Sequence, residues 1–532
     1  MKLERLIDDA TARAIGFAWL RAAVSPASDY GDRAFAEWQP FARGEEAAAQ
    51  RSTERIGAVA AAVDMARLEA AREIFRSVPD ATDAIARASM GDVLADAALL
   101  ELQRFFDALD RTDALLADAP GVDRVGNEAV RVCARALELG RAGKFGFYLA
   151  DAFDEALAKA RGALAQAQAE YDAVRGRAVA SIAKALGRDE LSGNEFIVMR
   201  SDMQGALPPG VRVVRESPTY VLCELDADES TIAALARRDS AAEDVERTEE
   251  AVRARLSDVV RMHAARLDQA ARAFGEADVL VAAARFARAY RCTAPSILPE
   301  AGFEISGARY LPLEETLERE GRTFTPIDVA LDGVAVLTGP NMGGKTVCLE
   351  TCGFVAMCAA FGLPVPADRA SVGLFDEVAW LGVGIDAELG GLLSSFAREV
   401  VRLRDVLHRT QGRLFVLFDE FARTTTPHEG KALLVAVLSR LQERRASGIV
   451  ATHLAGVAPA AGVRHFAVRG LRGIPNRLPA RDLHEALAAL ADSMDYTIAE
   501  VTHERDQYSD AIALASLLGL DDALIDDAYK AL

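Results

Sequence analysis

Residues 339–346 read Gly-Pro-Asn-Met-Gly-Gly-Lys-Thr and fit the phosphate-binding pattern Gly-x-x-x-x-Gly-Lys-[Ser/Thr]. A strand-like run, Val334–Thr338, comes before this loop, and an apolar, helix-like run, Val347–Ala360, follows it. In that context backbone N–H groups can converge on an anion at the N-terminus of a helix. The stretch therefore predicts an α/β domain of the P-loop type.

The residues of this loop have different expected roles. Gly343 and Gly344 let the backbone approach the phosphates. Lys345 supplies a positive charge, and Thr346 offers a hydroxyl to Mg²⁺. The residues expected to contact the nucleotide are Gly339, Pro340, Asn341, Met342, Gly343, Gly344, Lys345, Thr346 and Val347.

Two further apolar runs end in polar residues. One, at 414–418, leads into Asp419 and Glu420, and another, at 449–452, leads into His453. Both are typical of buried parallel strands, whose carboxyl ends form the ligand-binding edge of an α/β sheet. Asp419 is predicted to hold Mg²⁺, and Glu420 to orient or deprotonate the attacking water. His453 is predicted to contact the γ-phosphate or that water, with an ordinary strand-end histidine as the alternative.

Together these motifs resemble the ATPase domain of the MutS family, a branch of the ABC ATPases. The similarity rests on residues 339–346, on Asp419-Glu420 and on Ala451-Thr-His453. The resemblance implies ATP and Mg²⁺ as cofactors and ATP hydrolysis as the activity. In that case Glu420, His453 and Lys345 are the catalytic residues.

Three other segments resemble features of the same family. Leu392-Leu-Ser-Ser-Phe396 resembles its signature loop, which reaches across a dimer interface to the partner's ATP. Ser394 and Ser395 are the matching hydroxyls. Phe324 matches an aromatic residue that stacks on adenine, although a buried strand residue is an equally good interpretation. Residues 509–520 resemble the C-terminal helix, and the resemblance implies a dimer with a second copy or a MutS-like paralogue.

Two loops depart from the family pattern. After Asp419-Glu420 the family usually has Gly-Arg-Gly-Thr, whereas this chain has Ala422-Arg-Thr-Thr425. The usual Ser-Gly of the signature loop is replaced within Gly390-Gly-Leu-Leu393. Because glycine reaches positive φ without steric cost, we expect the rate of hydrolysis and its coupling across the dimer to differ from the family's.

Composition bounds the class of protein. The chain has 532 residues, 51% of them hydrophobic and 27% charged, which is typical of a globular protein with several domains. No apolar run approaches the roughly 18 residues needed to span a bilayer. The first residues mix charges too early for a secretion signal, and the six cysteines show no metal-type clustering. We therefore expect a cytoplasmic protein that makes no membrane contact.

The chain is expected to be multidomain, with three parts. Residues 1–140 are alanine-rich and predict an α-helical N-terminal core domain. Residues 141–300 predict two long helices of about 35–45 residues that bracket a small, β-containing tip at 191–229. Residues 301–532 predict the α/β ATPase domain with a C-terminal helical segment and an insertion of unassigned role at 461–500. The resemblance makes the long helices lever arms and the tip a clamp; an ordinary helical bundle is the alternative.

The charge of the tip bears on the partner. A clamp that grips DNA phosphates is expected to be basic, yet the whole chain has a net charge of −19. The tip carries three arginines, Arg200, Arg212 and Arg215, against seven acids: Glu195, Asp202, Glu216, Glu224, Asp226, Asp228 and Glu229. This balance counts against a phosphate-gripping clamp without excluding a local basic strip.

Two functions remain open on the sequence alone. The first is lever and clamp movement on DNA in mismatch repair, by a short form of the family that lacks the separate mismatch-reading domain. The second is an ATP-dependent chaperone that reactivates an adenosylcobalamin-dependent aminomutase of the lysine 5,6-aminomutase type. The acidic tip suits this protein client better, whereas DNA is the commoner partner in the family. A non-hydrolysing scaffold is disfavoured because Lys345, Asp419, Glu420 and His453 are all present.

Overall fold

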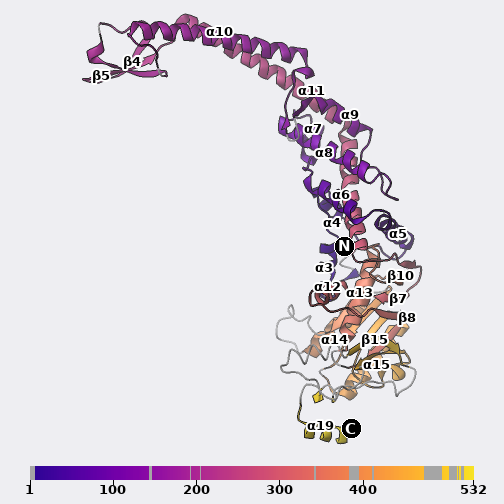
Figure 1. Cartoon of the computed structure of the whole chain (residues 1–532). Helices are drawn as coiled ribbons and strands as arrows, with labels where there is room; N and C mark the ends of the chain where they lie inside the picture. Colours follow the sequence, from indigo (N-terminus) through magenta and orange to yellow (C-terminus); the bar gives the residue numbers. More distant parts are fainter. Residues whose placement is uncertain are drawn as a thin grey trace. The chain divides into compact units, whose positions relative to one another are not determined.

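A computed structural model describes most of the chain and confirms a mixed helical and α/β architecture with several sheets (Figure 1). The described residues are 6–142, 146–191, 193–203, 205–340, 343–382, 395–409, 412–423, 425–471, 494–501, 512, 515–516 and 520–531. Within the described part, no helix is long and apolar enough to cross a membrane.

Contacts divide the chain into two compact units. The first comprises Met1–Ser77, Ala114–Arg124 and Ala273–Leu532, and the second comprises Val78–Asp113 and Val125–Arg272. The three domains predicted from the sequence are continuous stretches of chain, whereas each of these units combines segments that are distant in sequence. The division into 1–140, 141–300 and 301–532 therefore stays a prediction.

The N-terminal helices of the first unit pack on its α/β part. The Thr11 hydroxyl accepts a hydrogen bond from the Trp380 backbone N–H at 3.1 Å, and Arg402 donates to Asp8 at 2.9 Å. Asp8 also caps α2 by accepting from the Thr11 N–H. These helices are α2 (Asp9–Ala14), α3 (Phe17–Ala23), α4 (Asp29–Ala36), α5 (Glu46–Ala62) and α6 (Met65–Ser77).

The loop that leads into α4 is fixed by a buried carboxylate. Asp278 of α11 (Glu229–Ala289) is only 1% exposed and accepts from the backbone N–H groups of Ala27 and Ser28 and from the Ser28 hydroxyl, at 2.7–3.1 Å. Gly31 is required beside it, because a Cβ there would lie 2.3 Å from the Asp278 carboxylate. The segment that leads into α4 is therefore anchored to a helix some 250 residues away in sequence.

We expect Asp278→Ala to lower the free energy of unfolding of the first unit by about 2–4 kcal/mol, because each buried donor left without an acceptor costs roughly 1–3 kcal/mol. Urea unfolding monitored by circular dichroism measures the effect. Glu276→Ala, on an exposed position of the same helix, is the matched control. Equal midpoints for the two variants would show that the Asp278 network contributes nothing to stability.

A six-stranded sheet carries the predicted nucleotide site, with strand order β11-β12-β13-β9-β14-β15. All neighbouring pairs are parallel except β14 and β15, which are antiparallel. The strands are β9 (Val334–Thr338), β11 (Glu377–Gly382), β12 (Leu414–Asp419), β13 (Ser447–Ala451), β14 (Arg464–Leu471) and β15 (Met494–Glu500). Because β9, β12 and β13 run parallel side by side, their carboxyl ends share one edge of the sheet.

Helices and a second sheet complete the first unit. The four-stranded sheet has the order β6-β10-β7-β8. Its strands are β6 (Ser296–Leu298), β7 (Phe303–Ala308), β8 (Ile327–Leu331) and β10 (Arg369–Gly373). The helices are α12 (Leu311–Arg319), α13 (Lys345–Ala360), α14 (Ser395–Arg409), α15 (Pro427–Glu443), α16 (Val457–Ala461) and α19 (Asp522–Ala531).

The core of the sheet explains why its central strands could be predicted. Residues 414–418 of β12 are all buried, as are all five residues of β13. Such continuous apolar runs are typical of parallel strands covered on both faces. The predicted strand at 449–453 is observed two residues earlier, at Ser447–Ala451. The expected insertion at 461–500 is wrong for β14 and β15, which are strands of the main sheet.

In the second unit, two long helices lie antiparallel. Figure 1 shows α10 (Glu155–Ala185) running alongside α11. Arg161 of α10 lies 2.8 Å from Glu249 of α11, and Arg255 of α11 lies 2.8 Å from Asp154, the N-cap residue of α10. The predicted length of about 35–45 residues is wrong for both, since α10 has 31 residues and α11 has 61. Helix α11 is longer than predicted because it continues into the first unit. There Phe274 and the alanine-rich end of the helix are buried in the core.

The predicted tip is a small antiparallel sheet between these helices. Its order is β3-β5-β4, formed by β3 (Glu195–Met199), β4 (Val211–Glu216) and β5 (Tyr220–Leu225). Phe196, Val198, Val221 and Cys223 pack against the end of α10. The other elements of the unit are α7 (Thr82–Met90), α8 (Asp96–Leu115), α9 (Glu128–Leu137), β1 (Arg141–Ala142) and β2 (Gly146–Phe147).

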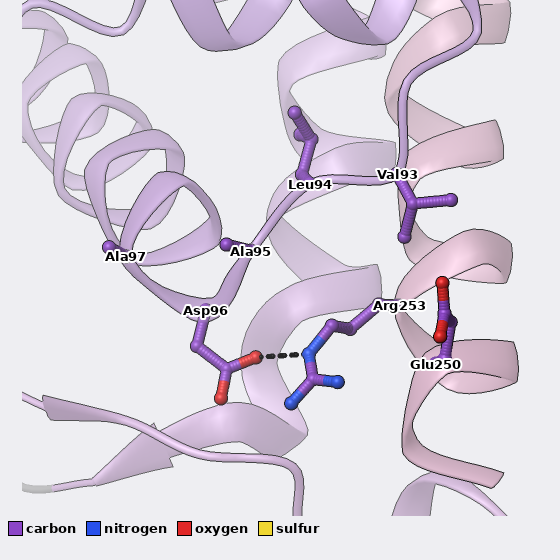
Figure 2. Close-up of a pocket in the computed structure, with 7 residues that line it drawn as sticks. All are labelled: Val93, Leu94, Ala95, Asp96, Ala97, Glu250 and Arg253. Atoms are coloured by element: carbon purple, nitrogen blue, oxygen red, sulfur yellow. Dashed lines mark hydrogen bonds and ion pairs between the residues drawn. The ribbon is translucent and has the colours of Figure 1, made fainter. Parts of the chain in front are cut away.

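A pocket opens in the second unit beside the start of α8 (Figure 2). Inside the pocket, Arg253 donates a hydrogen bond to Asp96 at 2.8 Å, so these two opposite charges form an ion pair. The lining residues are Val93, Leu94, Ala95, Asp96, Ala97, Glu250 and Arg253. None of them belongs to the predicted nucleotide site.

Candidate active site

The glycine-rich loop lies between β9 and α13, as its pattern predicts. Gly344 caps α13 with φ of 86°, a left-handed conformation that favours glycine. Gly343 is also required, because a Cβ there would lie 2.8 Å from the Pro340 carbonyl oxygen. Its N–H donates to that same oxygen at 3.0 Å. Asn341 and Met342 lie outside the described residues, and Val347 is half-buried in the first turn of α13.

Lys345 folds back over this loop. Its side chain is 5% exposed, and Nζ donates to the carbonyl oxygens of Gly339 and Pro340 at 2.9 and 3.0 Å. Burial lowers the pKa of Lys345, while the nearby carboxylates of Glu420 and Asp419 oppose that shift. The distance from Nζ to Glu420 Oε1 is 3.9 Å. The ammonium group is thus held between the loop and the acidic end of β12.

Asp419 and Thr346 meet at the edge of the sheet. The Thr346 hydroxyl donates to Asp419 Oδ2 at 2.9 Å. Burial raises the pKa of Asp419, and this hydrogen bond partly counters the rise. A hydroxyl oxygen and a carboxylate oxygen at this separation suit Mg²⁺, which prefers oxygen ligands and takes few of them from protein. The residues present therefore fit the metal that the motif implies.

Glu420 begins a strained loop. Its φ is 56°, and Ala422 follows with φ of 62°, although non-glycine residues rarely adopt positive φ. Ala422 stands where the resemblance leads us to expect glycine, and it adopts the backbone region that glycine favours. Two hydrogen bonds hold the loop in place: Glu420 N–H donates to the Ala451 carbonyl at 3.0 Å, and Ala422 N–H donates to Glu399 Oε2 at 2.8 Å.

The remaining predicted residues are His453, Phe324, Ser394 and Ser395. His453 is exposed and lies two residues beyond the end of β13. Phe324 is half-buried in the segment before β8 and is not itself a strand residue. Ser394 is outside the described residues, and Ser395 opens α14 with a side chain that is not described. The roles assigned to all of these residues stay predictions.

Two acids beside the site were not singled out from the sequence. Glu350 lies one helical turn beyond Thr346, and burial together with the charge of Asp419 raises its pKa to about 7. It is the only charged residue in the run Val347–Ala360, which is a signal that could have found it. Glu399 lies in α14, and no local pattern links it to the loop at Ala422.

If the site hydrolyses ATP, as the motifs predict, we expect Glu399→Ala to slow that turnover by about tenfold. The reason is that a buried N–H left unpaired costs roughly 1–3 kcal/mol and loosens the loop that carries Glu420. Glu399→Gln keeps an acceptor oxygen and is expected to retain most of the turnover. Steady-state kinetics separate this effect on kcat from an effect on KM. Equal losses in both variants would refute the positioning role of the Glu399 oxygen.

Nucleotide-binding α/β domains share three features: a mostly parallel sheet, a glycine-rich loop at the start of a buried helix, and polar side chains at the carboxyl edge of the sheet. The described part of this chain has all three. Residues 335–531 match MutS domain V. This region of the chain is therefore similar to MutS domain V, and the resemblance to the MutS-family ATPase domain that the motifs carry is confirmed for it.

Curated relatives match 37–44% of the chain. The identity is 35% over 206 residues to "DNA mismatch repair protein MutS" of Ruegeria sp., covering 37% of this chain and 23% of that protein. The identity is 33% over 208 residues to "Endonuclease MutS2" of Agathobacter rectalis, and the match covers 38% of this chain and 25% of that protein. The identity is 30% over 255 residues to "Endonuclease MutS2" of Clostridium botulinum, and the match covers 44% of this chain and 32% of that protein. The chain thus spans only 23–32% of the length of these relatives.

Proposed function

We propose that this chain is a MutS-type ATPase that binds ATP at residues 339–347 and hydrolyses it with Glu420. The observation that carries the proposal is the 2.9 Å hydrogen bond from Thr346 to Asp419, formed beside Lys345 at the N-terminus of α13. Phosphoryl transfer needs groups that position the phosphates and stabilise their charge. The glycine-rich loop, the Thr346 hydroxyl, the Lys345 ammonium and the two carboxylates at the end of β12 are such groups.

Each residue has a defined task in this proposal. Backbone N–H groups at the start of α13 bind the phosphates, and Lys345 exchanges the carbonyl oxygens of Gly339 and Pro340 for phosphate oxygens. Thr346 and Asp419 would hold Mg²⁺, which when bound neutralises phosphate charge. Glu420 orients the attacking water and accepts its proton. His453 contacts the γ-phosphate or the water.

The proposal includes a dimer. The resemblance implies a signature loop at residues 392–396, which continues into α14, with Ser394 and Ser395 completing the ATP site of a partner subunit. The partner is a second copy or a MutS-like paralogue. ATP binding would close the two subunits on each other and move the helices α10 and α11, which act as levers for the tip.

DNA is the first candidate for the macromolecule that the levers act on. The relatives named above include a "DNA mismatch repair protein" and two proteins named "Endonuclease", and these names support a nucleic-acid substrate. These relatives match only 37–44% of the chain, so the DNA assignment is carried by their names and not by the tip.

A protein client is the second candidate, and the surface of the tip favours it. Two of its arginines are already paired, Arg200 with Glu216 at 2.6 Å and Arg212 with Glu224. Exposed apolar side chains lie nearby on β3 and β4, with Ile197 47% and Val214 49% exposed. Exposed apolar side chains on the tip suit contact with a protein better than contact with DNA phosphates. The aminomutase is one such client; no relative named above supports it, and it stays a prediction.

A salt titration tests the choice of DNA. If DNA is the partner, we expect the affinity for duplex or branched DNA to fall steeply with salt, because each neutralised phosphate adds a slope of about −0.9 in log K against log [salt]. Fluorescence anisotropy with labelled DNA, in the presence and absence of ATP, measures it. Arg215→Ala should flatten the slope if the tip touches DNA, and Ile197→Ser should not. The absence of binding at about 50 mM salt would remove the DNA candidate.

A further inference from the structure

Helix α2, near the N-terminus of the chain, packs against both β11 and α13. The Thr11 hydroxyl accepts from the Trp380 N–H of β11, and the Thr11 side chain is fully buried. Ile15, the C-cap residue of α2, is also fully buried. A Cβ built on Gly353 of α13 would lie 2.4 Å from Ile15 Cγ2, so the two helices approach closely there. An N-terminal segment thus contacts the helix that begins with Lys345.

The carboxylate at the other end of α2 contacts α14. Asp8 Oδ1 accepts from the Thr11 N–H and from Arg402, both at 2.9 Å, and Oδ2 lies 3.7 Å from Arg409. Burial raises the pKa of Asp8, but the hydrogen bond from Thr11 and the charge of Arg402 lower it by more. The carboxylate is therefore ionised at neutral pH, and it faces two guanidinium groups of one helix.

The same two arginines fix α14 on β11. Arg402 Nε donates to the Trp380 carbonyl oxygen at 2.7 Å. Arg409 Nε donates to Glu377 Oε1 at 3.1 Å, and Glu377 is only 2% exposed. Asp8 lies against both anchors, so the N-cap of α2 and the first half of β11 together set the position of α14.

Helix α14 in turn holds the loop that carries the proposed base. Glu399, whose Oε2 accepts from the Ala422 N–H, lies three residues before Arg402, about 4.5 Å along the helix axis. Glu420 and Ala422 both have positive φ, a conformation that persists only where the surroundings hold it. A shift of α14 at Arg402 would therefore move the Glu399 oxygen away from this loop.

We propose that Asp8 is a positioning residue for the proposed ATPase reaction: it fixes α14 through Arg402, and α14 fixes the loop at Glu420 through Glu399. Asp8 lies outside residues 335–531, the region similar to MutS domain V. The N-terminal part of the chain would thus take part in catalysis without touching the nucleotide. This role rests on the proposed ATPase function.

Hydrogen exchange of the full chain, followed by mass spectrometry, measures the loop without any nucleotide. Asp8→Ala is expected to raise the exchange rate of the peptide that contains Ala422 by about tenfold, as is Glu399→Ala, since either change frees the loop from about one hydrogen bond. Asp8→Asn keeps the oxygen that accepts from Thr11 and Arg402 and should retain most of the protection. Asp9→Ala, at an exposed acid of the same helix, is the control and should exchange like the wild type.

Steady-state kinetics measure the effect on the reaction. Asp8→Ala is expected to lower kcat by about tenfold and to leave the KM for ATP nearly unchanged, because Asp8 does not contact the phosphate-binding loop. The double variant Asp8→Ala/Glu399→Ala is expected to be no slower than the slower single variant, because both changes act on one loop. Multiplied losses in the double variant would overturn the path through Glu399.

The outcomes separate this role from the proposed function. Equal exchange at Ala422 in Asp8→Ala and Asp9→Ala would overturn the inference. Equal kcat in these two variants, with an active wild type, would also overturn it and leave the ATPase proposal standing. A wild type that hydrolyses no ATP would refute the proposed function and the catalytic part of the inference, while exchange still decides whether Asp8 holds the loop. If thermal unfolding shows that Asp8→Ala does not fold, Arg402→Lys, which keeps the charge but loses the planar fork, replaces it with the same expectations.

Discussion

Glu420→Gln is expected to lower ATP turnover by roughly 10²–10⁴-fold while leaving ATP binding nearly unchanged, because a positioned general base contributes about that much to a rate. Glutamine keeps the size of the side chain but cannot take a proton from water. The side chain of Glu420 is 17% exposed and lies between Lys345 and Arg423, so a neutral residue there also alters the local charge. Phosphate release gives kcat, and calorimetry gives the dissociation constant.

The control for this variant is Glu443→Gln, an exposed glutamate of α15 that pairs with Arg440. It removes one negative charge from the same domain without approaching the site. Turnover by Glu420→Gln equal to that of Glu443→Gln would refute the role of Glu420 as base. A simultaneous loss of ATP binding would instead make Glu420 a binding residue.

Lys345→Met is expected to weaken ATP binding by about a hundredfold or more. Hydrogen bonds to charged groups are worth about 1.5–3 kcal/mol each, and Lys345 is positioned to make more than one to the phosphates. Methionine is preferred to alanine as the replacement, because Lys345 is buried and a shorter side chain would leave a cavity. The dissociation constant for Mg·ATP is the readout, with thermal unfolding as a check on folding.

Lys159→Met, at a lysine that is 75% exposed on α10, is the matched control for this loss of charge. It should bind ATP like the wild type. Binding by Lys345→Met within a few-fold of this control would contradict the assignment of the phosphate-binding loop.

The parts of the fold that could be predicted are those encoded in continuous stretches. The run Leu414–Phe418 is apolar throughout, so its burial as a parallel strand followed from composition alone. In contrast, β14 reads Arg-His-Phe-Ala-Val-Arg-Gly-Leu, which mixes charged and apolar residues and gives no such signal. The length of α11 was missed because its C-terminal third packs in a different unit from its beginning.

Only those residues of the candidate site that belong to a local sequence pattern could be predicted. Thr346 and Asp419 are 73 residues apart, and their contact followed from the rule that parallel strands present their carboxyl ends at one edge. Glu399 was missed because its place beside the loop at Ala422 depends on how α14 packs. The left-handed backbone conformation of Ala422 could not be predicted either, because alanine, unlike glycine, does not favour positive φ.

Structure determination of the Glu420→Gln variant with Mg²⁺ and ATP is the most direct measurement of the central claim, that residues 339–346 and the end of β12 form one nucleotide site. We predict the triphosphate against the N-terminus of α13, with the metal between Thr346 and Asp419. A nucleotide bound anywhere else on the chain, with Lys345 still folded onto the carbonyl oxygens of Gly339 and Pro340, would contradict the account.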